Sequence, residues 1–473
     1  MSGLPADARL AVIAAALSVG AWWVQAVPTL RAPPAGAHAW RETDGLIVAR
    51  NYCDDRAAFL EPRIDARGET PGRTGLEFPV LNWVSGQAGC ATGDFVTPWR
   101  LISFVLTLLG AAALFFFAHW LLGLEGAALT LASFATSPLV PYFSRTTQPD
   151  VAAMAFAILA LALTQSRLRW AAPAALSLAM LLKLPGIVYG LPMVLLLWQG
   201  SKTRGQRALS LLLSAASLVP PALWYHHART LQLLDGLETF AISRSPAQLW
   251  HEWQLPAFWV LNFVQRPFDT LLFPLAGALL VLVAAFTWRQ GTRLGRTLAL
   301  TWLGYVFACG YSGAHHEYYG LMVLPLAAVG SGWALRELSH RLRLARPGWL
   351  APALVVFFVA ALGWQVNRIK RWWPTHLDEW AELSRFSQET IGPRAGPRLM
   401  VFTDGSPETF WFMHQLGWLG DTSTPTVAAG RFGVVDRLRL REDARRVEVA
   451  LGTAGCAQRF ENAVAWVCEQ PKP

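Results

Sequence analysis

The chain has 473 residues, of which 53% are hydrophobic and only 15% are charged, and its formal net charge is +9 at pH 7. Soluble domains carry about 25% charged residues, so this composition excludes an ordinary soluble protein. Apolar windows of roughly 17–21 residues recur along the first three quarters of the chain, which is the length that crosses a bilayer. The sequence therefore predicts a polytopic membrane protein. The basic excess forms no aromatic-interleaved patch, so nucleic acid is not an expected partner.

The apolar segment at 9–27 is long and is followed by only a weak cleavage site, so we expect a retained membrane span rather than a signal peptide. The stretch "KLPG", Lys183–Gly186, interrupts the apolar region 170–198 and divides it into two short helices. In all, about eleven transmembrane helices are predicted. They are expected near 9–27, 100–120, 125–143, 150–166, 170–184, 186–198, 207–226, 269–288, 297–314, 319–336 and 349–366.

The charge of the short loops predicts the orientation. With the N-terminus inside and 170–198 counted as two passes, the inner loops are "QSRLRW", "QGSKTRGQR", "WRQGTRLGR" and "RELSHRLRLARPG". All are rich in Arg or Lys, as the positive-inside rule requires. The outer face then receives 28–99, 144–150, 183–186, 227–268, 313–320 and the tail. The predicted domains are a transmembrane domain, 1–366, which includes the outer loop 28–99, and an outer domain, 367–473.

The cysteines follow the same division. Cys53 and Cys90 lie in the first outer loop, and Cys456 and Cys468 lie in the tail. Both pairs can form disulfides in an oxidising periplasm. Cys309 falls inside a predicted span and is expected to be a buried thiol.

The tail has the mixed patterning of a small α/β domain. Ser406 is expected to cap a helix, with Pro407 in its first turn. Helical spacing is found at 376–391, and strand-like patterns are found at 398–404, 445–452 and 463–470.

The first outer loop contains "HAWRETDGLIVARNYCDD", His38–Asp55, which is dense in ionisable groups. If 41–52 is helical, Asp44 can serve as a general base at the membrane surface, with a pKa tuned by burial and by Arg41. The alternative is a solvated surface helix whose acids and arginines pair at i, i+3 spacing. Composition alone leaves both interpretations open.

Two further stretches place charges at the outer boundary. "SRTTQPD" brings Arg145 and Asp150 to the start of a span, where Asp150 can also simply complement a helix N-terminus. Lys183 lies at the broken tip of a hairpin, where it can reach lipid head groups or act as a point charge for a lipid-borne phosphate.

The stretch "HHEYYG" combines histidines with interfacial tyrosines: His315, His316, Tyr318 and Tyr319. The tyrosines alone would suit an aromatic belt. Adjacent histidines do not share one helix face, so contacts to phosphate or sugar hydroxyls are expected rather than a metal site. The sequence shows no phosphate-cradling glycine loop, Ser–His–Asp spacing or HExxH motif. Any energy for a reaction must therefore come with the substrate.

In order and spacing, four motifs resemble bacterial membrane glycosyltransferases of the GT-C fold. They are "H-x-W-R-x-x-D…A-R-N", "SRTTQPD", "KLPG" and "HHEYYGLMVLPL". The relatives concerned are the protein O-mannosyltransferases and the lipid A aminoarabinose transferase, broadly glycosyltransferase family 39, and the likeness covers roughly 9–366. It implies a polyprenyl-phosphate sugar donor and inverting transfer to a glycan, lipid or protein acceptor at the periplasmic face of the bacterial inner membrane. Membrane lipids are further expected partners. No cofactor is firmly implied, and a divalent metal ion is left open.

The resemblance also implies roles for individual residues. A first-loop carboxylate deprotonates the acceptor hydroxyl, and Asp44 fits the "WRxxD" form. Many relatives have adjacent acids, "DE", where this chain has "RETD", so Glu42 is the alternative base. Asp150 would be a second outer acid that orients substrate or metal. The donor phosphate would be held by Lys183, Arg145 and Tyr319, with His316 nearby.

Three other functions remain as alternatives. A transporter or flippase of lipid-linked sugars predicts functional polar groups near the bilayer midplane, often on broken helices. A ligase would transfer a whole lipid-linked glycan by the same chemistry. A non-catalytic assembly protein would leave the clustered outer acids without a purpose.

Overall fold

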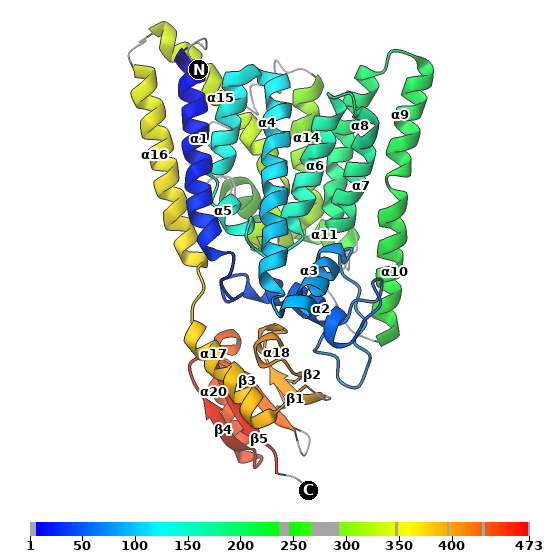
Figure 1. Ribbon diagram of the computed structural model, residues 1–473, viewed down its shortest axis with the longest axis vertical. Coiled ribbons are helices and arrows are strands. Elements are labelled where there is room, and N and C mark those ends of the chain that lie inside the picture. Colours follow the sequence, from blue (N-terminus) through cyan, green and yellow to red (C-terminus); the bar gives the residue numbers. More distant parts are fainter. Residues whose placement is uncertain are drawn as a thin grey trace. The chain divides into compact units, whose positions relative to one another are not determined.

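The chain divides into two compact units, which Figure 1 shows in a computed structural model of the protein. The structure describes residues 6–235, 246–265, 293–345, 349–394, 397–427 and 431–471. The first unit, here called the helical unit, comprises Met1–Leu30, Arg100–His226 and Ile242–Arg371. The second, here called the mixed unit, comprises Arg31–Trp99, His227–Ala241 and Trp372–Pro473. The first outer loop thus belongs to the same compact unit as the C-terminal tail.

The helical unit consists of apolar helices joined by short connections. Its longer helices are α1 (Ala6–Ala26), α4 (Val96–Ala135), α6 (Asp150–Thr164), α7 (Ala172–Leu182), α8 (Gly190–Gly200), α9 (Arg204–Ala216), α10 (Val219–Asp235), α14 (Arg293–His315), α15 (Leu324–Ala345) and α16 (Leu350–Ile369). Shorter elements are η1 (Val27–Thr29), α5 (Leu139–Phe143), η2 (Arg169–Ala171), η3 (Leu184–Tyr189), α11 (Pro246–Gln254), α12 (Pro256–Trp259), η4 (Val260–Gln265), η6 (Glu317–Met322) and η8 (Lys370–Trp372). Two of these helices extend beyond the helical unit, because 96–99 of α4 and 227–235 of α10 belong to the mixed unit.

The number of full-length spans is smaller than the sequence predicts. Within the described residues, four helical segments are long and apolar enough to cross a membrane: Ala8–Thr29, Val96–Ala135, Arg204–Asp235 and Leu350–Ile391. The prediction of eleven is corrected because segments such as α6, with 15 residues, are short. At 1.5 Å per residue a helix of that length covers only about 22 Å, less than a hydrocarbon core of roughly 30 Å. The predicted span at 269–288 lies outside the described residues.

Two predicted helix boundaries are confirmed. Gly123 has φ +73° and ψ −179°, so α4 is interrupted between the predicted spans 100–120 and 125–143. A positive φ is readily adopted by glycine, which has no Cβ to clash with the following carbonyl. At "KLPG", α7 ends at Leu182 and the chain resumes as η3, because Lys183 is extended, with φ −160° and ψ 108°.

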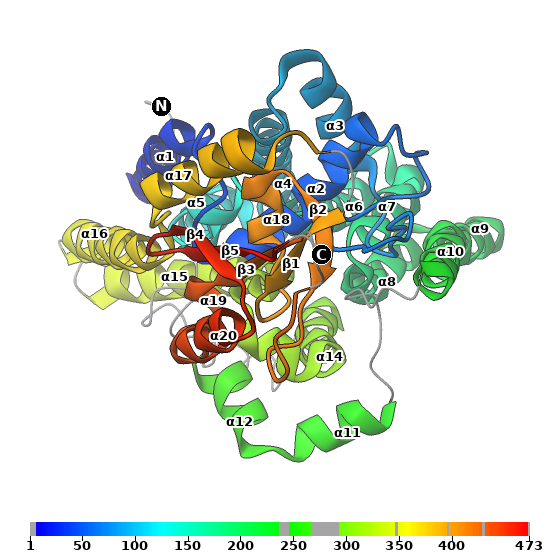
Figure 2. The same ribbon diagram turned by 90° about the horizontal axis from the view of Figure 1, so that it is seen from below.

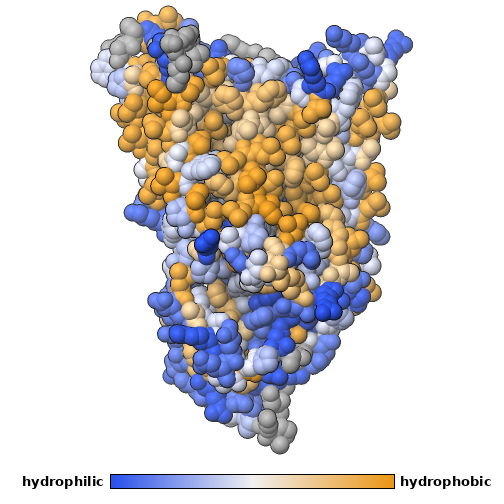
Figure 3. Space-filling model, in the orientation of Figure 1, coloured by the Kyte–Doolittle hydropathy of each residue, from blue (hydrophilic) through white to orange (hydrophobic). Residues whose placement is uncertain are grey.

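The surface of each unit agrees with its composition. Apolar side chains cover the face of the helical unit seen in Figure 3, whereas the mixed unit is largely hydrophilic there. Several of the apolar residues are more than half exposed, among them Leu17 (65%), Val24 (75%) and Val356 (67%). Exposure of such apolar side chains to water is unfavourable, so they are expected to contact lipid.

The mixed unit contains a five-stranded sheet of order β2-β1-β3-β5-β4. The strands are β1 (Pro397–Phe402), β2 (Leu416–Leu419), β3 (Phe432–Asp436), β4 (Ala457–Glu461) and β5 (Ala465–Glu469). β1 pairs in parallel with β2 and β3, whereas β5 is antiparallel to β3 and β4.

Helices cover both faces of this sheet, as Figure 2 shows. On one face, Leu399 and Val434 pack with α17 (Leu377–Phe386) and α18 (Glu408–Met413). On the other, Phe402 and Val435 pack with α20 (Glu442–Thr453). The alternation follows from the period of two in a β-strand. The predicted small α/β domain is therefore confirmed.

Individual predictions for the tail have mixed outcomes. The helical region at 376–391 and the strands near 398–404 and 463–470 are confirmed. The predicted strand at 445–452 is wrong, since it lies in α20, where Val447 and Leu451 bury one helix face at i, i+4. Ser406 does not cap α18 through its side chain. Instead, its backbone N–H donates to Asp404 Oδ1 at 3.1 Å.

Both predicted disulfides are present. Cys53–Cys90 joins α2 (Ala39–Asp54) to α3 (Val80–Thr92), and Cys456–Cys468 lies beside the sheet. Cys309 is buried in α14 and takes part in neither disulfide. The oxidising environment expected of the outer residues is consistent with both bonds.

Candidate active site

Helix α2 of the mixed unit carries the first group of predicted site residues, and most of its length is buried. Leu46, Ile47 and Val48 are all at most 1% exposed. α3 approaches so closely that a Cβ added at Gly86 would lie 2.5 Å from the carbonyl oxygen of Ala49. The helix at 41–52 is thus confirmed. The alternative of a solvated surface helix is wrong about solvation, but the i, i+3 pairing that it expects is present between Arg41 and Asp44.

Arg41 holds two carboxylates near the start of α2. Its Nη1 lies 2.7 Å from Asp44 Oδ2, and its Nη2 lies 2.6 Å from Glu77 Oε1. The guanidinium side chain is 8% exposed, so these charge-assisted hydrogen bonds are partly shielded from water. Glu77 precedes α3 and was not predicted as a site residue, because an isolated acid before "FP" has no local signature.

The two candidate bases differ in access to solvent. The side chain of Asp44 is 21% exposed, whereas Glu42 is only 1% exposed. A general base must come within hydrogen-bond reach of the proton that it removes. The more accessible Asp44 meets this requirement better than Glu42.

The helical unit gathers the second group of predicted residues. Asp150 begins α6, and Lys183 follows the end of α7. Lys183 Nζ lies 3.2 Å from Asp150 Oδ1, with side-chain exposures of 10% and 1%. The break at "KLPG" matters here, because the extended backbone of Lys183 ends the helix at this residue.

Aromatic side chains from η6 complete this cluster. The ammonium of Lys183 lies 5.5 Å from the ring centroid of Tyr318 and 5.3 Å from that of Tyr319. His316 stacks on Tyr318 with 5.3 Å between ring centroids. The hydroxyl of Tyr305 donates to the carbonyl oxygen of Tyr319 at 2.6 Å, which fixes the backbone of η6. Cation–π contacts within about 6 Å attract the ammonium to the ring faces.

Arg145 and His315 are the remaining predicted residues of the helical unit. Arg145 is buried in the turn before α6, with its guanidinium 4.7 Å from the ring centroid of Tyr142. His315 ends α14, and its side chain is outside the described part of the structure. Gln148, an uncharged residue that was not predicted as a site residue, is fully buried in the same turn as Arg145.

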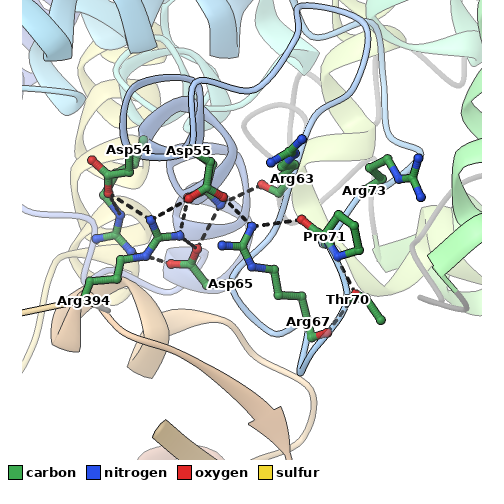
Figure 4. A network of polar contacts seen from close by, with 12 residues as sticks. Asp54, Asp55, Arg63, Asp65, Arg67, Thr70, Pro71, Arg73 and Arg394 are labelled. Atoms are coloured by element: carbon green, nitrogen blue, oxygen red, sulfur yellow. Dashed lines mark hydrogen bonds and ion pairs between the residues drawn. The ribbon is translucent and has the colours of Figure 1, made fainter. Parts of the chain in front are cut away.

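A network of charges secures the C-terminal end of α2 within the mixed unit (Figure 4). Asp65 is fully buried and binds Arg50 at 2.6 Å and Arg394 at 2.8 Å. Burial opposes ionisation of Asp55, but a hydrogen bond from Arg67 and the charge of Arg394 outweigh it, so the pKa of Asp55 lies below its usual value. The network therefore connects the first outer loop to the tail through paired rather than isolated charges.

The predicted residues thus form one group in each unit. The mixed unit contains Arg41, Glu42 and Asp44. The helical unit contains a chain of contacts from Asp150 through Lys183 and the two tyrosines, Tyr318 and Tyr319, to His316, with Arg145 in the turn before α6. Among the residues that the structure describes, no three His, Cys, Asp or Glu side chains lie close enough to hold a metal ion.

Solved structures define the class of fold. The chain matches ArnT from Cupriavidus metallidurans in the apo state with a TM-score of 0.64 and 14% identity, covering 97% of each chain. ArnT bound to undecaprenyl phosphate matches with a TM-score of 0.62 and 15% identity, again covering 97% of each chain. The chain thus has a GT-C fold related to that of ArnT, as the sequence resemblance indicated.

A family model and an archaeal enzyme extend the likeness. Residues 76–225 match the model described as dolichyl-phosphate-mannose-protein mannosyltransferase. The Archaeoglobus fulgidus oligosaccharyltransferase AglB, in complex with an inhibitory peptide and a dolichol-phosphate, matches with a TM-score of 0.58 and 12% identity. That match covers 96% of this chain and 72% of AglB. No curated protein matches the chain by sequence.

Proposed function

We propose that the protein is a glycosyltransferase that moves a sugar from a polyprenyl-phosphate donor to an acceptor. The buried pair of Asp150 and Lys183 beside Tyr318 and Tyr319 is the observation that carries the proposal. A compact ammonium with aromatic neighbours suits the phosphate of a lipid. Further support comes from the related structures, since ArnT was solved with undecaprenyl phosphate and AglB with a dolichol-phosphate.

The chemistry is a single displacement at the anomeric carbon. Asp44 takes the proton of the acceptor hydroxyl, and the oxygen attacks the anomeric carbon as the bond to the phosphate oxygen breaks. Polyprenyl phosphate leaves with the electron pair of that bond, and the sugar inverts its configuration. Lys183 stabilises the charge that develops on the departing phosphate. Arg41 orients Asp44 through their ion pair.

The remaining site residues are assigned to binding. Arg145, His316 and Tyr319 contact the donor phosphate or its sugar, together with Tyr318 and His315. Asp150 positions Lys183 and the substrate, and Glu42 is the alternative base. The reaction takes place at the periplasmic face of the bacterial inner membrane, which receives 28–99 and the tail from 367.

Two other functions share much of this description. A ligase would carry out the same displacement on a longer lipid-linked glycan, and the likeness to AglB favours keeping it as the second candidate. A flippase would move the lipid-linked sugar without breaking its glycosidic bond. The glycosyltransferase, the ligase and the flippase can be distinguished experimentally by the fate of the donor.

The test uses the full chain in proteoliposomes with undecaprenyl phosphate carrying a tritiated monosaccharide. A membrane extract depleted of endogenous donor supplies the acceptors. The proposal predicts radioactivity in an acceptor fraction and free undecaprenyl phosphate in the lipid fraction. Movement of intact donor between leaflets, without loss of its sugar, would establish the flippase instead. Turnover only of oligosaccharide-bearing donors would establish the ligase.

A further inference from the structure

Gln148 is a buried polar side chain for which the protein provides no partner among the described residues. It lies in the turn between α5 and α6 and is fully buried. Neither its Oε1 nor its Nε2 makes a hydrogen bond within the described part of the chain. Leaving a buried amide unpaired is costly, so native proteins seldom keep one without a function.

A third polar atom of this kind lies two residues further on. Asp150 directs Oδ1 toward Lys183, but its Oδ2 is buried and accepts no hydrogen bond from the described residues. The turn into α6 therefore has one donor, Gln148 Nε2, and two acceptors, Gln148 Oε1 and Asp150 Oδ2, all unpaired. These three atoms belong to the same short segment as Arg145, which is assigned to donor binding.

The chemistry of these atoms selects among ligand groups. A lipid phosphate at neutral pH only accepts hydrogen bonds, and a carboxylate oxygen would repel it. A sugar hydroxyl both donates and accepts, so it can satisfy a carboxylate oxygen and an amide together. A buried amide that hydrogen-bonds a substrate hydroxyl discriminates strongly against substrates that lack that hydroxyl.

We infer that Gln148, together with Oδ2 of Asp150, binds hydroxyl groups of the donor's sugar and determines which sugar the protein accepts. The inference rests on the proposed function and assigns the sugar and the phosphate to different groups. Lys183 contacts the phosphate, and Gln148 contacts the hydroxyls. Gln148 is thus a specificity-determining residue within the "SRTTQPD" stretch.

The test compares binding of two probes by the purified full chain: undecaprenyl phosphate, and undecaprenyl phosphate carrying mannose, glucose or galactose. Wild-type protein is expected to bind at least one sugar-bearing lipid about tenfold more tightly than the bare lipid. Gln148→Leu is expected to remove that advantage and to leave the affinity for undecaprenyl phosphate within about twofold. Gln165→Leu, at the other end of α6, is the matched control and should change neither affinity.

Thermal unfolding separates a ligand-binding role from a structural one. Because Gln148 has no partner in the described protein, Gln148→Leu should keep or raise the melting temperature. A fall of several degrees would show that the amide supports the fold and would overturn the inference. Gln148→Asn serves as a second variant, since it keeps a polar amide but shortens its reach, and the same loss of sugar discrimination is expected.

The outcomes distinguish this inference from the proposed function. Equal weakening of both probes by Gln148→Leu, or unchanged sugar discrimination, would overturn the inference. If wild-type protein binds undecaprenyl phosphate but no sugar-bearing lipid more tightly, the inference again fails while binding of a lipid phosphate stands. If wild-type protein binds neither probe, the proposed function itself fails.

Discussion

Lys183 and Asp150 form a buried ion pair, with Nζ 3.2 Å from Oδ1, although they come from different helices and are 33 positions apart in the sequence. Neither residue carries a recognisable motif by itself. The break in the hairpin after α7 and the start of α6 bring them together. Removing one partner of a buried ion pair leaves the other charge buried without compensation. The stability of the protein is therefore expected to be sensitive to a single substitution at either residue.

Substitution of one partner should therefore destabilise the protein more than substitution of both. Lys183→Met and Asp150→Asn are each expected to lower stability by about 3–5 kcal/mol, because each leaves the other charge buried. The double variant should recover most of that loss but bind undecaprenyl phosphate at least about tenfold more weakly than wild type. Thermal unfolding and lipid binding measure the two effects, with Lys202→Met, at an exposed position, as the control. Additive losses in the double variant would show that the two charges are not coupled.

Asp44 and Glu42 should differ sharply in their effect on turnover. Asp44→Asn is expected to lower the rate of donor consumption by about 10²–10⁴-fold, the usual contribution of a general base. Glu42→Gln should have a smaller effect on turnover, since Glu42 is only 1% exposed. The comparison requires matched amounts of folded protein in the membrane. Full transfer by Asp44→Asn, with loss in Glu42→Gln, would move the role of base to Glu42.

Arg394 should be essential for the stability of the mixed unit. It contacts Asp54, Asp55 and Asp65, and Asp65 is fully buried. Arg394→Met is expected to lower the free energy of unfolding by about 3–5 kcal/mol, because it leaves buried carboxylates short of positive charge. Arg446→Met is the matched control, since its ion pair with Asp443 is largely exposed and should contribute less than about 1 kcal/mol. Similar melting temperatures for the two variants would contradict the importance of the network.

Asp436 should make the stability of the protein fall as pH rises. Burial and the charge of Glu408 raise the pKa of Asp436 from 3.8 to about 7. The folded state therefore holds a proton that the unfolded state releases above about pH 4, and this stabilisation is lost as pH rises through 7. Between pH 5 and pH 9 the loss should be about 2–3 kcal/mol, since one pKa unit corresponds to about 1.4 kcal/mol. Asp436→Asn should flatten the melting temperature over this range, whereas Asp443→Asn should preserve the wild-type slope.

Local sequence patterns predict those helices, helix breaks and strands whose formation depends on residues close together in the sequence. The helix around Asp44, the break at Lys183 and the sheet of the tail all follow from short-range spacing and backbone preference. The stretch at 445–452 was wrongly predicted as a strand because apolar and polar residues alternate over the four residues "VEVA". Its burial in fact follows Val447 and Leu451 at helical spacing.

Long-range pairing was beyond the reach of those patterns. Arg394 and Asp65 are 329 positions apart, yet they bind each other at 2.8 Å. Glu77 bridges to Arg41 across 36 positions. Gln148 could not be predicted as a site residue for another reason. An uncharged amide points to a ligand only once its burial and its lack of partners among the described residues are known.

Transfer of the sugar requires the protein to break the bond between that sugar and the lipid phosphate. The most direct measurement is a single-turnover experiment with purified wild-type and Asp44→Asn protein and equimolar undecaprenyl-phosphate sugar in the presence of acceptor. We expect wild-type protein to release one undecaprenyl phosphate for each sugar transferred, and Asp44→Asn to bind the donor but release almost none. Intact donor after incubation with wild-type protein and every acceptor fraction, despite tight binding, would contradict the account.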